Sequence, residues 1–193
     1  MVRGSKFDQA EFVEAALVLL SEGGPTAVTM AAIARRSGAP TGSIYHRFPR
    51  RAAVVAAAWL GALTVFADEI EAAANLVAWS RSHPREARAL FLNEPASLFD
   101  TAPPEELSTA IRAQEARIEA AFESRLSAPF PVGPDRAEAF AGLRFAIIDG
   151  PIALIRPYLQ SGEPIPAFVD NLAASLRRLV VAEPHPLRSR AAE

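Results

Sequence analysis

The chain of 193 residues contains no cysteine. This absence excludes disulfides, thiolate nucleophiles and cysteine-based zinc sites together, and it fits a reducing compartment. Histidine is also scarce: His46, His83 and His185 are widely separated and form neither an HExxH motif nor a pair with zinc-ligand spacing. We therefore expect no metal site and no cofactor.

A secretory leader and a long hydrophobic run are missing as well. The N-terminal sequence MVRGSKFDQAEF reaches Asp8 and Glu11 before any apolar run, so we do not expect export. The longest nearly uncharged run, Ala52–Ala67, is shorter than the roughly 20 apolar residues of a membrane-spanning helix. We interpret it as a buried helix in a soluble, cytoplasmic protein.

The net charge of −2 conceals an uneven distribution. Residues 1–51 hold seven Lys and Arg against four Asp and Glu, a sum of +3, and residues 52–193 hold thirteen against eighteen, a sum of −5. A basic segment on an acidic body suits a polyanion bound at one end, because neutralising phosphates supplies much of the affinity for nucleic acids.

Helical periodicity and capping residues occur along the chain, and no segment shows the two-residue alternation of a half-buried strand. Asp8, Thr29 and Asp135 are placed to cap helices. A long helix is expected from about Arg50, ending near Ala67 or past Glu71. Further helices are expected over Pro84–Leu92 and Glu105–Leu126, from Asp135 with an interruption or kink at Gly150-Pro151, and from about Pro166. The predicted fold class is all-α.

The segment Thr29–Arg51, TMAAIARRSGAPTGSIYHRFPRR, predicts two short helices around a corner at Gly38. A longer helix precedes them and ends at Gly23-Gly24-Pro25. In the second short helix, Ile44 and Phe48 are four residues apart and face the core together. This layout is that of a helix-turn-helix, whose second helix enters the major groove of DNA.

The exposed face of that second helix carries small or hydrogen-bonding residues that could contact base edges and phosphates. Arginines at the start of the following helix and the N-terminus of the first short helix suit phosphate. The predicted DNA-binding residues are Thr29, Thr41, Gly42, Ser43, Tyr45, His46, Arg50 and Arg51.

These residues resemble the DNA-binding signature of the TetR family of transcriptional regulators. The resemblance covers roughly residues 8–60 and rests on Thr29, Ile33-Ala34, Gly38, Gly42-Ser43, Tyr45, Phe48 and Arg51. Pro40 replaces a more usual Ser or Thr, and Arg51 replaces the usual Lys. The resemblance implies a homodimer, with dimerisation through the C-terminal helices, about 135–182, and an all-helical ligand domain.

We therefore expect a helix-turn-helix DNA-binding domain over residues 1–51, continuing into the long helix, and an effector-binding and dimerisation domain over 52–193. The expected function is a ligand-released repressor that binds double-stranded DNA at a palindromic operator. The effector and the residues that contact it are not identified by the sequence. No paired acid–base signature or phosphate loop indicates an enzyme, so no catalytic residue is assigned.

Several alternatives remain open at this stage. Thr29–Arg51 could be a plain three-helix element with a solvated basic edge, and the protein could be a helical adaptor or small-molecule-binding protein without operator binding. Tyr45 could be partly core, and Asp149 could satisfy a kinked backbone rather than orient a ligand. The pairs Trp59/Phe66 and Trp79/Phe91, with Phe122, Phe140 and Phe145, could line a pocket, but aromatic residues at helical spacing favour a plain core.

Overall fold

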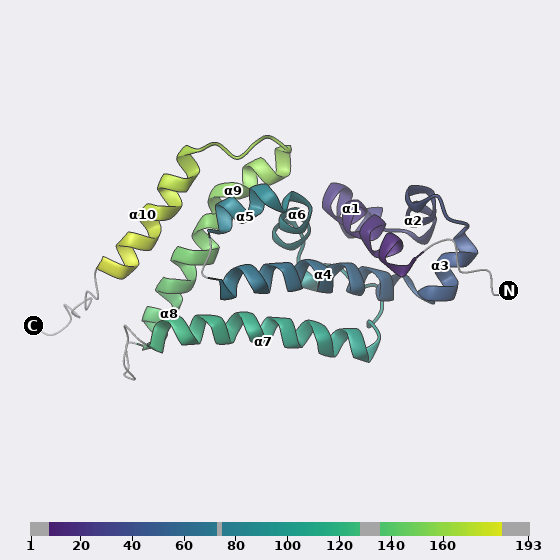
Figure 1. The fold of residues 1–193 in the computed structure, drawn as a ribbon, viewed down its shortest axis with the longest axis horizontal. Coiled ribbons are helices and arrows are strands. Elements are labelled where there is room, and N and C mark those ends of the chain that lie inside the picture. The colour runs from purple at the N-terminus through teal and green to yellow at the C-terminus, as the bar shows by residue number, and fades with distance from the viewer. Residues whose placement is uncertain (1–7, 73–74, 128–135, 183–193) are drawn as a thin grey trace, which may run out of the picture.

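The computed structural model describes residues 8–72, 75–127 and 136–182, which contain helices and connecting turns but no strand (Figure 1). The all-α fold class is confirmed. In chain order the elements are α1 (Gln9–Ala27), α2 (Met30–Ser37), α3 (Thr41–Arg47), α4 (Arg51–Glu71), α5 (Leu76–Ser82), α6 (Pro84–Leu92), η1 (Pro95–Ser97), α7 (Glu105–Ser127), α8 (Arg136–Arg144), the π-helical turn η2 (Phe145–Asp149), α9 (Gly150–Ser161) and α10 (Phe168–Ala182).

Helix α1 begins where the capping pattern predicts. The Asp8 carboxylate accepts a hydrogen bond from the backbone N–H of Gln9 at 2.5 Å, and the N–H of Asp8 donates to the Glu11 carboxylate at 3.2 Å. Helical geometry breaks at Gly24, whose φ of +69° favours glycine. The predicted break is therefore present, although helical hydrogen bonding continues beyond it to Ala27. Asp135, the other acidic cap expected, lies outside the described residues.

Helix α4 extends to Glu71, which answers the boundary question that the sequence leaves open. It packs against α1 and α6 and, along much of its length, against α7 (Figure 1). By length and composition alone it could cross a membrane, but 61% of its most apolar window is buried inside the structure. The interpretation of this apolar run as a buried core helix is confirmed.

Two groups of buried side chains lie along α4. The first contains Phe12, Ile33, Ile44 and Phe48, and α4 contributes Val54, Trp59 and Leu63 to it. The second contains Trp79, Phe91, Phe122 and Ile155, and α4 contributes Phe66 and Ile70. Because one helix supplies residues to both groups, the N-terminal helices and the body are fixed to a common support.

The aromatic residues that the sequence groups together are packed into the core. The ring centroids of Phe66 lie 5.3 Å from Trp79 and 5.5 Å from Phe91, and those of Trp79 and Phe91 lie 5.9 Å apart. These spacings are typical of tilted and edge-to-face aromatic pairs. Plain core packing, the favoured interpretation, holds for Trp59, Phe66, Trp79, Phe91 and Phe122, and Phe140 packs partly buried against them. It is wrong for Phe145, which is 53% exposed.

Gly150 and Pro151 are the first residues of α9, and the π-helical turn η2 directly before them interrupts the regular α-helix, as the expected interruption or kink requires. A π turn changes the hydrogen-bond register, which accommodates the missing N–H of Pro151 inside a helical path. At Gly150 an added Cβ would lie 2.7 Å from Leu176 Cδ1 and 2.9 Å from the Phe145 carbonyl oxygen. Gly150 therefore permits the close approach of α10. Asp149 is exposed, with its carboxylate 3.6 Å from Arg144 Nε.

Helix α10 buries one side of its apolar stripe and exposes another. Val169 and Ala173 are 1% and 2% exposed, whereas Phe168 and Leu172 remain 55% and 44% exposed. Phe145, on η2, is 53% exposed. Helix α10, which carries Phe168 and Leu172, lies at the opposite end of the molecule from α3 (Figure 1).

Candidate DNA-binding interface

Local capping interactions build the pair of helices α2 and α3. Thr29 Oγ1 accepts a hydrogen bond from the Ala32 N–H at 3.1 Å, which fixes the start of α2. Gly38 ends α2 with a φ of +67°, in the left-handed region that the predicted corner requires. Pro40 then occupies the N-cap position of α3. The predicted corner between two short helices is confirmed.

The core holds α3 by the two side chains that periodicity selects. Ile44 is fully buried and Phe48 is 3% exposed. The same rotation leaves Thr41, Gly42, Tyr45 and His46 exposed and Ser43 half-buried. The structure therefore brings together on one short helix the residues predicted to read DNA.

Tyr45 and Gly42 define the shape of this exposed face. Tyr45 is 51% exposed. A Cβ added at Gly42 would meet no atom within 4 Å, so packing inside the protein does not require glycine there. A free backbone at this position allows close approach of another molecule.

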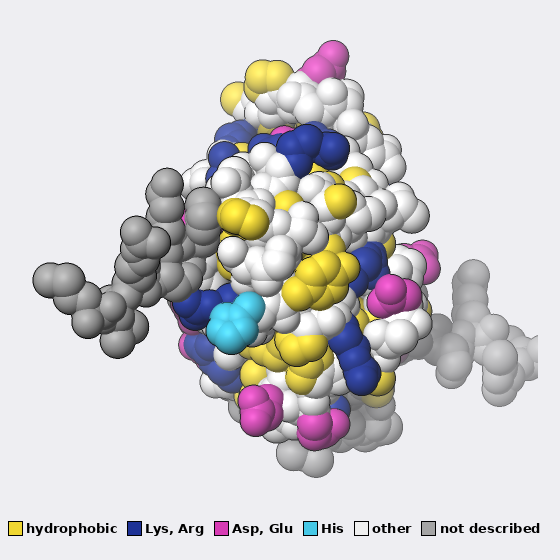
Figure 2. Space-filling model, turned by 90° about the vertical axis from the view of Figure 1, so that its right-hand side faces the viewer, with side chains coloured by type: hydrophobic (Ala, Val, Ile, Leu, Met, Phe, Trp, Pro, Cys, Tyr) yellow, Lys and Arg dark blue, Asp and Glu magenta, His cyan; other side chains and the backbone are white. Residues whose placement is uncertain are grey.

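Arginine side chains surround this face. Arg35, Arg47 and Arg50 are exposed, whereas Arg36 forms an ion pair with Glu22 at 3.1 Å. Figure 2 views this end of the molecule and shows basic side chains and a histidine bordering exposed apolar and uncharged groups. Of these exposed arginines, the sequence predicts only Arg50 as a DNA-binding residue, and the structure leaves Arg35 and Arg47 exposed as well. Arg47 ends α3, directly after His46, and this position was the available signal.

The structure places Arg51 differently from its neighbour. Its guanidinium turns inward and donates to backbone carbonyls of Val28, Pro25 and Leu98. Its Nη1 also lies 3.5 Å from the Asp100 carboxylate, and the side chain is 21% exposed. The Arg51 side chain therefore does not belong to the exposed face of α3. Thr29 is exposed, but its hydroxyl oxygen already accepts a hydrogen bond as the cap of α2.

Among the described residues, no group of three or more His, Cys, Asp or Glu side chains is placed to hold a metal ion. His83 stacks on the Trp79 ring with centroids 5.4 Å apart, and its Nδ1 lies 3.0 Å from Ser82 Oγ. His185 lies outside the described residues.

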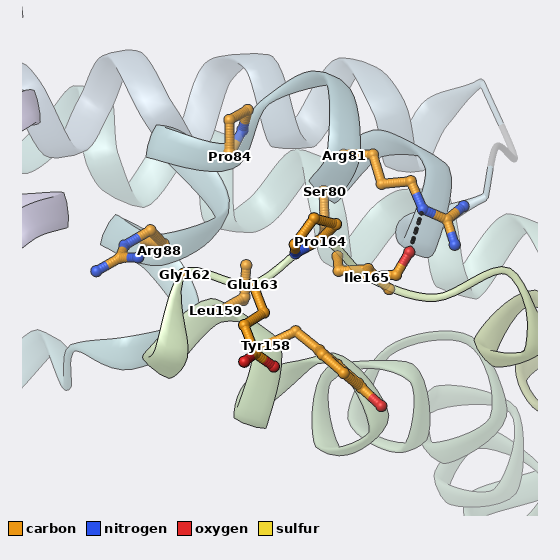
Figure 3. A pocket seen from close by; sticks show the side chains of 10 residues that line it. All are labelled: Ser80, Arg81, Pro84, Arg88, Tyr158, Leu159, Gly162, Glu163, Pro164 and Ile165. Carbon is orange, nitrogen blue, oxygen red and sulfur yellow. Dashed lines mark hydrogen bonds between the residues drawn. The ribbon is translucent and has the colours of Figure 1, made fainter.

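A groove of about 400 Å³ lies between the α5–α6 corner and the end of α9 (Figure 3). Pro84, Leu159, Pro164 and Ile165 give it mostly apolar walls. The polar and charged groups of its lining come from Ser80, Arg81, Arg88, Tyr158 and Glu163. Arg88 Nε also donates to the carbonyl oxygen of Ser21 in α1 at 2.8 Å. One side chain thus contacts both the groove and the helix that supports α2 and α3.

The fold and the exposed face of α3 define a helix-turn-helix DNA-binding protein. Residues 12–58 match the model of the family described as bacterial regulatory proteins, tetR family. The recognition made from the sequence is confirmed: the chain carries the N-terminal DNA-binding domain of tetR family transcription regulators. Because that family consists of regulators, the match also supports a protein that is not an enzyme.

The whole chain is similar in fold to a crystal structure of a candidate tetR family transcription regulator from Shewanella sp. PV-4. That similarity has a TM-score of 0.63 and covers 92% of this chain and 97% of the other, at 16% sequence identity. At this identity it shows the fold alone. No curated protein sequence matches the chain.

Proposed function

We propose that the protein is a sequence-specific transcriptional repressor that binds a palindromic operator as a homodimer and leaves it when an effector binds. The observation that carries the proposal is the exposed polar face of α3, held outward by buried Ile44 and Phe48 inside the segment that matches the tetR family. A short helix presented in this way fits the major groove of DNA. Cytoplasmic localisation is part of the same proposal.

The exposed residues divide between base edges and phosphates. Thr41, Gly42 and Ser43 lie in the first turn of α3, the part of a recognition helix that contacts base edges. Tyr45, His46 and Arg50 are exposed around them and are assigned to the phosphate backbone, which fixes register without reading sequence. Exposed Arg47 joins this group. The N-terminus of α2 at Thr29 offers further N–H groups to a phosphate.

The C-terminal helices supply the proposed dimer surface. Exposed Phe145, Phe168 and Leu172 lie on η2 and α10, inside the segment 135–182 expected to dimerise. Apolar side chains of this size are stabilised when a second apolar surface removes them from water. Two copies of α3 spaced about 34–36 Å apart would then read the two halves of a palindrome. On this proposal residues 1–51 bind DNA and 52–193 carry dimerisation and effector binding.

The groove of Figure 3 is the effector site that we propose. Its apolar walls suit an apolar or aromatic molecule, and Arg88 connects it to Ser21 in α1. An effector releases DNA only if it binds the conformation that does not fit the operator more tightly, because differential affinity is all that a ligand can use to shift states.

Selection of bound fragments from the source genome tests the proposal. The purified protein is incubated with genomic fragments at near-physiological salt, and the retained sequences are determined. Enrichment of a palindromic sequence supports a dimeric regulator. Retention that is salt-sensitive but blind to sequence supports a helical adaptor instead, because phosphate contacts alone carry no sequence information.

A further inference from the structure

We propose that Arg51 is a positioning residue for operator binding: it ties the α1–α2 corner to the connection between α6 and α7 and thereby sets the orientation of α3. This inference rests on the proposed function, because orientation of α3 matters only if α3 reads DNA. It reassigns Arg51, which the sequence places on phosphate.

Three segments far apart in the sequence meet at this guanidinium. Arg51 Nε donates to the Val28 carbonyl oxygen at 2.6 Å, Nη2 donates to that of Pro25, and Nη1 donates to that of Leu98 at 3.3 Å. Pro25 and Val28 lie at the end of α1, and Leu98 follows η1. A planar fork with five N–H groups can reach several carbonyls at once, which a single ammonium group cannot do in the same way.

The acceptors lie directly against the parts that position α3. Val28 precedes Thr29, the N-cap of α2, and its side chain is fully buried in the same group of core residues as Ile44 and Phe48. Leu98 is also fully buried in that group. A shift of the α6–α7 connection would therefore act on the Arg51 side chain and, through Val28, on the start of α2.

Electrostatics at this position favour an internal role over phosphate binding. All three guanidinium nitrogens already donate inward, and the Asp100 carboxylate, itself 58% exposed, lies 3.5 Å from Nη1. A phosphate at the same place would compete with that carboxylate. Arg50, by contrast, is exposed and lies next in the chain, so it is a matched control with the same side chain.

The test compares Arg51→Gln with Arg50→Gln by titrating the selected operator over a series of salt concentrations. Loss of a phosphate contact flattens the dependence of log affinity on log salt by about 0.9, and Arg50→Gln is expected to do so. Arg51→Gln is expected to weaken binding roughly 5- to 30-fold at fixed salt, the effect of one misplaced interaction, with the salt slope unchanged.

Conservative variants separate the two roles further. Arg50→Lys keeps a phosphate-binding charge and should keep the salt slope of the wild type. Arg51→Lys should restore little of the operator affinity that Arg51→Gln loses, because one ammonium group cannot replace the guanidinium fork. The proposal is overturned if Arg51→Gln flattens the salt slope as Arg50→Gln does, if Arg51→Lys restores wild-type binding, or if Arg51→Gln leaves affinity unchanged.

Hydrogen exchange on the protein without DNA tests, independently of the operator, whether Arg51 holds the α1–α2 corner. Arg51→Gln should speed amide exchange across residues 28–48 while leaving residues 76–92 at the wild-type rate, and Arg50→Gln should change neither region. If amide exchange across residues 28–48 is unchanged in Arg51→Gln, the proposed positioning role of Arg51 is overturned. If the wild type selects no DNA sequence, the proposed function fails, and the exchange result still decides whether Arg51 holds this corner. Arg51→Lys provides the same readout should the glutamine variant fail to fold.

Discussion

The two ends of the molecule expose different chemistry on similar helical supports. At the N-terminal end, α3 buries Ile44 and Phe48 and presents small polar groups bordered by arginines. At the other end, η2 and α10 leave Phe145, Phe168 and Leu172 about half exposed. The first surface suits a polyanion and the second suits another apolar surface, so on the proposed function the fold assigns DNA binding and dimerisation to different ends of the molecule.

Removing a core anchor of α3 is expected to have the largest effect. Ile44→Ala truncates a fully buried side chain and should lower the free energy of unfolding by about 2–5 kcal/mol. Urea denaturation measures the loss. His46→Ala, two residues further along on the exposed face, is the control and should stay within about 0.5 kcal/mol of the wild type. Equal losses in the two variants would contradict the inside-outside assignment of α3.

A charge on the apolar face of α10 should next separate the proposed dimer. Leu172 is 44% exposed, so Leu172→Asp is expected to keep the fold of one copy while placing an uncompensated charge between two copies. Light scattering after gel filtration should show a monomer. Ala113→Asp, which adds the same charge to an exposed position of α7, should remain dimeric. A dimer that persists in Leu172→Asp would exclude this face from the interface.

A methyl group at Gly42 should affect stability and DNA binding in opposite directions. Open space surrounds this position, so Gly42→Ala is expected to raise the free energy of unfolding by up to about 1 kcal/mol through helix propensity. The same methyl group should weaken operator binding because it obstructs close approach of the backbone. Thermal unfolding and operator titration measure the two effects. Unaltered affinity would remove Gly42 from the interface.

The smallest effect is expected at the ion pair that joins α5 to α10. The hydrogen bond from Arg81 lowers the pKa of Asp170 below its ordinary value, and the charged atoms lie 2.7 Å apart. A lowered folded-state pKa stabilises the fold above the unfolded pKa of about 4, and this contribution is lost as the pH falls through the folded value.

Asp170→Asn should therefore cost less than about 1 kcal/mol at pH 7, because both side chains are about one-third exposed to solvent. The difference from the wild type should shrink below pH 4 in urea denaturation. A difference that stays constant into acid would show that the Asp170 charge is not its source. Operator binding should be unaffected.

Local patterns explain why the N-terminal end was well predicted from the sequence. The caps at Asp8 and Thr29, the left-handed Gly38 and the spacing of Ile44 and Phe48 each depend on neighbours within a few residues. Because neighbouring residues alone determine the caps, the left-handed turn and the buried face of α3, the sequence predicts them, and the structure confirms all three.

Long-range contacts set the features that the sequence did not reveal. The carbonyl partners of Arg51 lie 23, 26 and 47 residues away, so its inward orientation has no local signal. Helix α5 was not predicted; it is short and buried against α9 and α10. The groove beside Arg88 likewise joins residues from distant helices.

A single titration shows whether α3 reads a specific DNA sequence. The wild-type protein is titrated against the selected genomic fragment and against a scrambled fragment of equal length and composition at the same near-physiological salt. The selected fragment should bind more than about 10³-fold more tightly than the scrambled one. Equal affinity for the two fragments would contradict sequence-specific binding by α3.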